Sequence, residues 1–268
     1  MEKKSSKNSA GSMIITYFTI PISLLVSFLL FEFVLGSPSN FIENNPANNP
    51  LPGNYLGLVY KGGYVVPVLM STVLIVIIFC VERFISINRS RGKNNVDKFL
   101  HDIRAMVNAG NLDQALKACQ EQKGSVGNVI HAGLTTYQQM TKDTVLDKEQ
   151  KIAAIQKSIE ETTSLEMPML SKNLSVISTI ASTATLIGLF GTVLGMIKAF
   201  AAMATAGAPD AVALANGISE ALINTALGIG ASAIAIIMYN FFTTKIDAIT
   251  YGIDEAGYSI VQSFSAKH

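Results

Sequence analysis

The side chains of this 268-residue sequence that could do chemistry in an apolar setting are hydroxyls in its third and fourth long apolar runs. Ser178, Thr185 and Thr192 recur every seven residues, which keeps them within about 40° of one face of a helix. Thr225 and Ser232 repeat that spacing in the next run. Hydroxyls in membrane helices commonly bond the carbonyl four residues earlier, or a neighbouring helix at about 0.6 kcal/mol per bond. We favour that packing role for Ser178, Thr185 and Ser232.

Glu220 is the carboxylate that an apolar setting makes most costly, at about 2.5 to 3.5 kcal/mol at the centre of a membrane helix. It precedes Asn224 and Thr225. The polar residues that could line a pore are Asn224, Ser178, Thr185, Ser232 and Lys198. Three interpretations of Glu220 are open. It could sit at headgroup level, where the helix dipole favours an anion; it could face a pore or partner; or it could pair with Lys198, expected at the same depth on the third helix, within or between subunits.

The sequence offers no side-chain set for nucleophilic or metal chemistry. Its histidines, His101, His131 and His268, lie outside the apolar runs, and it contains neither an HExxH motif nor a phosphate-binding loop. Cys80 and Cys119 fall on different expected helices and are interpreted as small buried apolar residues. We therefore expect a protein that is not an enzyme and that binds no cofactor or metal.

Glycines mark the faces on which the third and fourth helices are expected to pack. Gly188, Gly191 and Gly195 are three and four residues apart, so on a helix they form one stripe where a neighbouring backbone can come close. Gly217 and Gly228 belong to a second small-residue face on the fourth helix. Both faces are predicted to be helix-packing surfaces.

Composition places the chain in a membrane. Hydrophobic residues make up 49% of it and charged residues 15%, and the apolar excess is concentrated in a few long runs. The basic residues cluster at the ends of these runs, and a net charge of +1 provides no field that would attract nucleic acid. By the positive-inside rule, both termini are expected in the cytoplasm.

The expected fold is an all-α integral membrane protein with four transmembrane helices and a cytoplasmic helical bundle. Its expected parts are a cytoplasmic N-terminus (1–12), an extra transmembrane helix (13–35), a periplasmic loop (36–63), a transmembrane helix (64–85), a cytoplasmic helical domain (86–171), a transmembrane helix (172–205), a periplasmic turn (206–212), a transmembrane helix (213–244) and a cytoplasmic C-terminal tail (245–268).

Two of these parts need an argument. A signal peptide is the alternative for residues 13–35, but we prefer a retained helix because the run is longer than an ordinary signal h-region and no clear Ala-x-Ala site follows it. The Asn- and Pro-rich composition of residues 36–63 predicts a loop that cannot bury a core.

Apolar residues at helical spacing organise the cytoplasmic domain. Gly110 is expected to end one helix, and Asn111 with Gln114 to form a capping box at the start of the next. The apolar faces are Val96, Phe99, Leu100, Ile103, Met106 and Val107; Leu112, Ala115, Leu116 and Cys119; Val126, Val129, Ile130, Leu134 and Tyr137; and Ile152, Ile155 and Ile159.

The charges of the last of these helices are expected to face solvent. Lys157, Glu160 and Glu161 predict the solvated side of one long helix that runs into the membrane. A partner-docking surface is the alternative.

Two motifs in the membrane runs resemble those of a known family. Ile187-Gly-Leu-Phe-Gly-Thr-Val-Leu-Gly-Met196, with Gly217-Ile-Ser-Glu-Ala-Leu-Ile-Asn-Thr-Ala-Leu-Gly228 and Tyr239-Asn240, is similar to the paired motifs of the MotA/TolQ/ExbB proton-channel family, most closely its ExbB and TolQ branch. The resemblance covers roughly residues 62–245. The helix expected at 13–35 lies outside the three-helix pattern of that branch.

The resemblance implies a homopentamer whose third and fourth helices line a central pore. The pore would hold the single membrane helices of an ExbD- or TolR-like partner, which bears a protonatable aspartate, and protons would be the coupling ion. Thr192 and Thr225 match hydroxyl positions of the family, and Glu220 matches its glutamate position. The glycines of the third helix would let subunits pack around the pore. Lipid and a TonB-like linker are further expected partners.

The function implied is that of an ExbB-like subunit of a proton-driven motor in the inner membrane of a Gram-negative bacterium, energising TonB-dependent outer-membrane transport. The sequence departs from the family where Thr185 and Ile234 replace the usual prolines, so less kinked helices are expected. A TolQ-like subunit, a MotA-like flagellar or gliding stator subunit, and a non-conducting membrane scaffold are the alternatives.

Overall fold

The computed structural model describes residues 18–204 and 210–267. The expected N-terminus (1–12), the first residues of the helix expected at 13–35 and most of the expected turn (206–212) lie outside the described residues. The described chain is built of helices and contains no β-strand. Four of its helices are long and apolar enough to cross a membrane. The predicted all-α membrane fold is confirmed.

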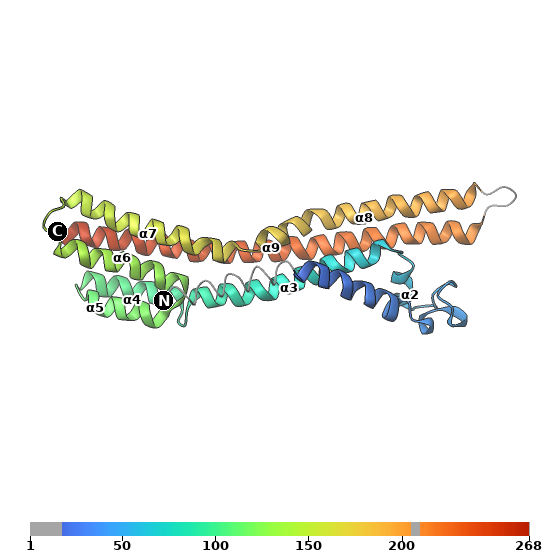
Figure 1. Ribbon diagram of the computed structural model, residues 1–268, viewed down its shortest axis with the longest axis horizontal. Coiled ribbons are helices and arrows are strands. Elements are labelled where there is room, and N and C mark those ends of the chain that lie inside the picture. The colour runs from blue at the N-terminus through green and yellow to red at the C-terminus, as the bar shows by residue number, and fades with distance from the viewer. Residues whose placement is uncertain (1–17, 205–209, 268) are drawn as a thin grey trace. The chain divides into compact units, whose positions relative to one another are not determined.

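The described elements follow the chain in a simple order (Figure 1). They are the helix Phe18–Leu35, which ends in the π-helical turn η1 (Phe31–Leu35), then η2 (Pro38–Asn40), η3 (Ile42–Asn44), α2 (Tyr55–Tyr60), α3 (Val65–Arg91), α4 (Val96–Asn108), α5 (Leu112–Gln122), α6 (Gly124–Lys142), α7 (Lys148–Ser171), α8 (Leu174–Met203) and α9 (Ala211–Lys267). They form two compact units: a membrane unit, Met1–Cys80 with Ser175–Tyr239, and a bundle unit, Val81–Leu174 with Asn240–His268.

In the membrane unit, α8 and the first part of α9 run antiparallel (Figure 1). Gly188 of α8 lies against Gly228, and Gly195, two turns further along α8, lies against Gly217. Thr185 and Ile234, which stand where the family usually has prolines, lie inside uninterrupted α-helix. Both helices therefore keep their hydrogen-bond ladders, as expected without proline.

The segment between the first two long helices is folded, which corrects the expectation of a loop without a core. Phe41 is 1% exposed, and its backbone forms an isolated bridge with Pro50. The ring of Tyr60 stacks on Phe31 at 4.6 Å between centroids and meets Phe41 edge-on at 5.5 Å. The few aromatic residues of this polar segment are enough to anchor it on the end of the preceding helix, because each buries a large apolar area.

The helix Phe18–Leu35 packs through residues four apart. Thr19, Ser23 and Ser27 are buried, and Phe31 and Leu35 continue the same stripe. Within the described part of the chain, the hydroxyls of Ser23 and Ser27 have no hydrogen-bond partner. Small residues on this stripe permit close helix contact, in keeping with membrane helix packing.

The bundle unit buries the apolar faces expected of it. Its core includes Phe99 and Ile103 of α4, Cys119 of α5, Ile130 of α6 and Ile155 of α7. The C-terminal part of α9 joins this core, since the ring of Phe264 packs edge-on against Tyr137 at 4.9 Å. The predicted helical bundle thus contains residues expected only to form a tail.

The ends of the bundle helices confirm one prediction and correct two. Gly110 has a φ of +81° and follows the end of α4 as predicted. The side chain of Asn111 makes no capping bond, so the expected capping box is wrong; a capping box occurs instead at Asp147 and Gln150, at the start of α7. The expected long helix into the membrane is also wrong, because α7 ends at Ser171 and Asn173 takes a φ of +63° before α8 continues.

Candidate functional site

Close contact between α8 and α9 positions the candidate site. A Cβ atom added to Gly188 would lie 2.8 Å from the backbone oxygen of Asn224, and one added to Gly228 would lie 2.8 Å from the backbone oxygen of Ala184. A Cβ on Gly195 would lie 2.7 Å from backbone atoms of α9. Backbone atoms cannot rotate aside, so these positions need glycine. We call this contact the glycine seam.

The glycine seam joins two helices of one chain. The expectation was that the glycines of α8 let neighbouring subunits pack around a pore. In the structure their stripe is covered by α9 of the same chain, with Gly191 against the side chain of Asn224 and Gly217 against Ala199. A stripe of small residues predicts a close neighbour but not which helix supplies it.

The seam brings the two expected hydroxyls together. The hydroxyls of Thr192 and Thr225 form a hydrogen bond in which either can donate. Thr192 Oγ1 also lies 3.2 Å from the carbonyl oxygen of Gly188 and 3.4 Å from that of Ala221. Both threonines are half-buried, so part of each residue is exposed at the surface of the chain.

The Thr192–Thr225 pair can bind a carboxyl group in either of its protonation states. Each hydroxyl has one proton to donate and lone pairs with which to accept. It can therefore donate to a carboxylate and accept from a carboxylic acid without changing its own charge. A fixed charge at the same place would favour one of the two states strongly.

Glu220 and Lys198 form an ion pair within the chain, with 2.6 Å between Oε1 and Nζ. The side chain of Glu220 is 10% exposed and that of Lys198 57% exposed. The pairing confirms one of the three interpretations open for Glu220. The helix dipole does not stabilise Glu220, because α9 begins at Ala211, more than two turns earlier, and the dipole acts within the first turn.

The remaining expected site residues are spread over different surroundings. Asn224 is fully buried in the chain, which corrects its expected place among pore-lining residues. Ser232 donates to the carbonyl oxygen of Ala181 across the seam, the helix-to-helix bond expected of it. Ser178 is half-buried, and Thr185 is exposed on α8, apart from the buried seam residues.

Sequence reasoning missed the glycines at the corner between α2 and α3. Gly63 has a φ of +74°, and a Cβ there would lie 2.6 Å from Glu220 Oε1. Gly62 is buried, and its carbonyl oxygen accepts a hydrogen bond from Asn224. A Gly-Gly pair directly before an apolar run was the available signal, since adjacent glycines indicate a tight turn.

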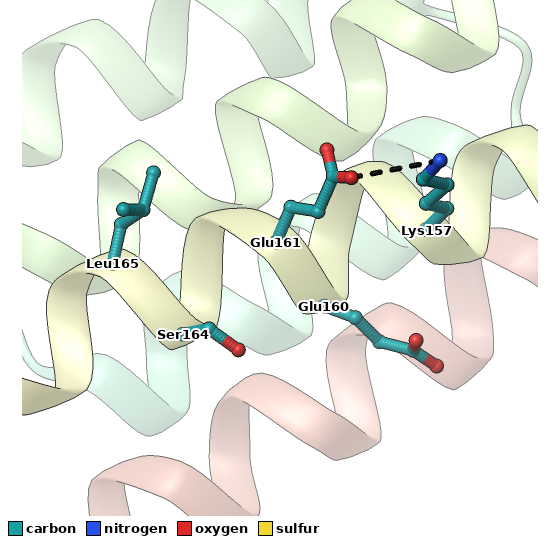
Figure 2. Close-up of a pocket in the computed structure, with 5 residues that line it drawn as sticks. All are labelled: Lys157, Glu160, Glu161, Ser164 and Leu165. Atoms are coloured by element: carbon teal, nitrogen blue, oxygen red, sulfur yellow. Dashed lines mark ion pairs between the residues drawn. The ribbon is translucent and has the colours of Figure 1, made fainter.

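A shallow surface pocket lies on α7 of the bundle unit (Figure 2). It is lined by Lys157, Glu160, Glu161, Ser164 and Leu165, and Lys157 pairs with Glu161 at 3.7 Å. The side chains of Lys157 and Glu161 are 75% and 66% exposed. Exposed pairs of this spacing contribute about 0.3 to 0.5 kcal/mol, so the expected solvated side of the helix accounts for the charges.

The described residues place no group of three or more His, Cys, Asp and Glu side chains where they could hold a metal ion. Cys119 is buried in the bundle unit, and this burial raises the pKa of its thiol to about 12. A thiol of that kind is protonated at neutral pH and neither attacks nor ligates.

Comparison with known proteins identifies the family. Residues 121–255, which contain both threonines, the ion pair and the glycine seam, match the MotA/TolQ/ExbB proton channel family. The chain belongs to this family. The resemblance seen in the paired membrane motifs is thereby confirmed. The chain, whose described residues include four helices of membrane-spanning length, is a multi-pass membrane protein of the proton-channel class.

Relatives carry both ExbB and TolQ names. The chain is 26% identical to the Tol-Pal system protein TolQ of Pseudomonas aeruginosa over 59% of this chain and 68% of that protein. It is 25% identical to the biopolymer transport protein ExbB of Neisseria gonorrhoeae over 75% of this chain and 90% of that protein. It is 36% identical to the ExbB of Pseudomonas putida over 34% of this chain, a match that spans only 28% of that relative.

Proposed function

We propose that the chain is an ExbB-like subunit of a proton-driven motor in the inner membrane, which energises TonB-dependent outer-membrane transport with an ExbD-like partner. The observation that carries the proposal is the Thr192–Thr225 hydroxyl pair, held at a helix seam by two half-buried residues. A partner carboxyl that alternates between protonated and ionised states would find suitable hydrogen bonds in both. Protons moving through the site would supply about 2.3 kcal/mol per charge per 100 mV of membrane potential.

The assembly proposed is a homopentamer in which α8 and α9 surround a central pore. Half-buried Thr192 and Thr225 would face the membrane helix of an ExbD- or TolR-like partner there. A TonB-like linker would transmit the motion, and lipid would cover the outer surface.

A TolQ-like function is the second candidate, because relatives named TolQ match as well as relatives named ExbB. In that case the same proton-driven chemistry would serve the Tol-Pal system. A MotA-like flagellar or gliding stator subunit is a third candidate, and a membrane scaffold that conducts no protons is a fourth.

Replacement of either threonine by valine tests the proton function. The full-length complex is purified from its native membrane, reconstituted in liposomes and assayed for proton flux driven by a potassium diffusion potential. Thr192→Val and Thr225→Val should each lower the flux by more than about tenfold, since valine keeps the shape but removes the hydrogen bonds. Thr179→Val is the matched control, because Thr179 is exposed on α8 and its hydroxyl bonds back to Ser175.

Full flux in both valine variants would contradict the proposed proton path. No flux from the unmodified complex, with assembly intact, would favour the scaffold. The mass of the same detergent-purified complex should equal five copies of the chain plus a whole number of copies of a single-helix partner.

A further inference from the structure

Asn224 is a fully buried amide in the interior of the membrane unit. Its Nδ2 donates to the carbonyl oxygen of Gly62 at 2.8 Å. Its Oδ1 is also buried and has no hydrogen-bond partner among the residues that the structure describes. An unpaired buried oxygen is destabilising, and a residue that only filled space here would be less costly if it were apolar. The amide donor is therefore the feature that explains an asparagine at this position.

The acceptor belongs to the corner between α2 and α3. Gly62 and Gly63 lie just after α2, and α3 begins at Val65. A Cβ on Gly62 would lie 2.9 Å from Ile223, and one on Gly63 would lie 2.6 Å from Glu220. Residues 220, 223 and 224 fall on one face of α9. This face holds the corner by contact, and Asn224 holds it by a hydrogen bond.

Asn224 also touches α8. A Cβ on Gly191 would lie 2.5 Å from the Cβ of Asn224 and 2.8 Å from its Nδ2. Gly191 directly precedes Thr192, and Asn224 directly precedes Thr225. Asn224 is thus packed between the α2–α3 corner and the helix that carries the other hydroxyl of the pair.

We propose that Asn224 is a positioning residue for the Thr192–Thr225 pair. Its amide ties the carbonyl oxygen of Gly62 to α9, and its contact with Gly191 keeps α8 at the separation where the two hydroxyls meet. A shift of the α2–α3 corner would then change the distance between the two hydroxyls. The tie itself stands on the structure, whereas its effect on proton flux rests on the proposed function.

The variants Asn224→Asp and Asn224→Leu test the tie without reference to transport. The protonated carboxyl of N224D can donate to Gly62, whereas the ionised carboxylate and the leucine of N224L cannot. Thermal unfolding of the detergent-purified protein is measured from pH 4 to pH 8. N224L should unfold about 3 °C or more below the unmodified protein at every pH. N224D should lose at least as much at high pH, because its carboxylate would be a buried charge, and should recover toward the unmodified protein as the pH falls.

The other charged groups near Asn224 could also titrate, but they are the same in every variant compared. They are Glu220 on α9, its partner Lys198 on α8, and Lys61 beside the corner, whose ammonium donates to the carbonyl oxygens of Pro46 and Ala47. Asn216→Asp, on the same helix but half-buried, is the matched control and should show no such recovery. The tie is wrong if N224D follows N224L at all pH values, or if both unfold like the unmodified protein.

Proton flux through the same variants tests the positioning role. Relative to the unmodified complex at each pH, N224L should lose at least about tenfold in flux at every pH. N224D should lose at least as much at pH 8 and regain flux toward pH 5. If Thr192→Val and Thr225→Val abolish flux while N224D and N224L retain it, the positioning role is overturned and the proposed function stands. If the valine variants retain full flux while N224D unfolds as expected, the proposed function and the role built on it fail, and only the structural tie remains.

Discussion

Neutral hydroxyls, rather than charges, form the polar centre of the glycine seam. Thr192 and Thr225 satisfy each other and nearby carbonyl groups, so they can lie among apolar helices at little cost. Glu220 would be costly there alone, and its contact with Lys198 makes the combination neutral. The fixed polar groups at this site therefore carry no net charge, so in the proposed motor the protonation state of the partner's carboxyl would decide the interaction.

Cys119 is expected to be inert in the folded protein. Burial raises the pKa of its thiol to about 12, so at pH 8 almost none of it is the reactive thiolate. Iodoacetamide at pH 8 should leave Cys119 unmodified in the native protein and modify it fully in denaturant, as read by peptide mass spectrometry. The thiol ionises near its ordinary pKa of about 9 in the unfolded protein and at about 12 in the folded protein. The unfolded state therefore loses its proton first, so the free energy of unfolding should fall as the pH rises from about 9 to about 12. Rapid native labelling would show that the bundle core opens readily.

At the level of helices, the glycine seam makes two nearby glycines respond in opposite ways. Gly228→Ala places a Cβ 2.8 Å from the backbone of α8 and should lower the free energy of unfolding by about 1 to 3 kcal/mol, because the helices must separate. Gly230→Ala meets nothing within 4 Å and should raise helix stability by up to about 1 kcal/mol. Thermal unfolding of both variants in detergent gives the comparison. Equal effects of the two alanines would mean that the seam is not closely packed.

Arg83 holds the end of α7 within the bundle unit. It is 1% exposed, and its Nη1 donates to the carbonyl oxygens of Met169 and Leu170 at 3.1 Å each. Its guanidinium also pairs with the neighbouring carboxylate of Glu82. These carbonyls lie in the last turn of α7, where the helix dipole favours a cation.

Removal of this arginine should therefore weaken the bundle unit. Arg83→Met should cost about 1.5 to 3 kcal/mol, the range for hydrogen bonds to a charged group. Arg89 is exposed on α3, the helix that also carries Arg83. Arg89→Met should therefore change the free energy of unfolding by no more than about 0.5 kcal/mol. Thermal unfolding of the purified variants measures both, and a similar small change in each would exclude the capping role.

For the whole molecule, the charge pattern predicts an orientation that labelling can test. Residues 36–63 contain one basic residue, Lys61, whereas Arg89, Arg91 and Lys93 cluster at the other end of the second long helix. In a variant without native cysteines, Asn49→Cys should react with a membrane-impermeant maleimide on intact spheroplasts. Glu149→Cys should react only after lysis. Both positions are exposed in the structure, so burial would not explain a failure to react.

Labelling of both cysteines from the same side would contradict the proposed membrane order. Labelling of Glu149→Cys alone on intact spheroplasts would show that the orientation is the reverse of the one expected, with the same number of membrane helices. An inverted orientation would place Glu220 and Lys198, which are expected near the outer surface, near the inner one. It would therefore reverse the direction in which protons would cross the proposed site.

Much of the fold follows from local pattern. Uninterrupted apolar length marks the membrane helices, and apolar residues at helical spacing mark the buried faces of α4 to α7, because both properties depend on neighbours along the chain. The glycine stripe of α8, Thr192 and Thr225 are visible for the same reason. Motifs of this kind also place the chain in the MotA/TolQ/ExbB family.

The tertiary structure decided what covers each of these faces. The spacing of Gly188, Gly191 and Gly195 predicts that another helix packs closely against them. Only the folded chain shows that this helix is α9 of the same subunit. Likewise, nothing local distinguishes a pore-lining Asn224 from one that binds Gly62, a residue 162 positions away. Hydrogen bonds and contacts between distant segments depend on the packing of the whole chain. The pattern of residues in any one segment therefore does not predict them.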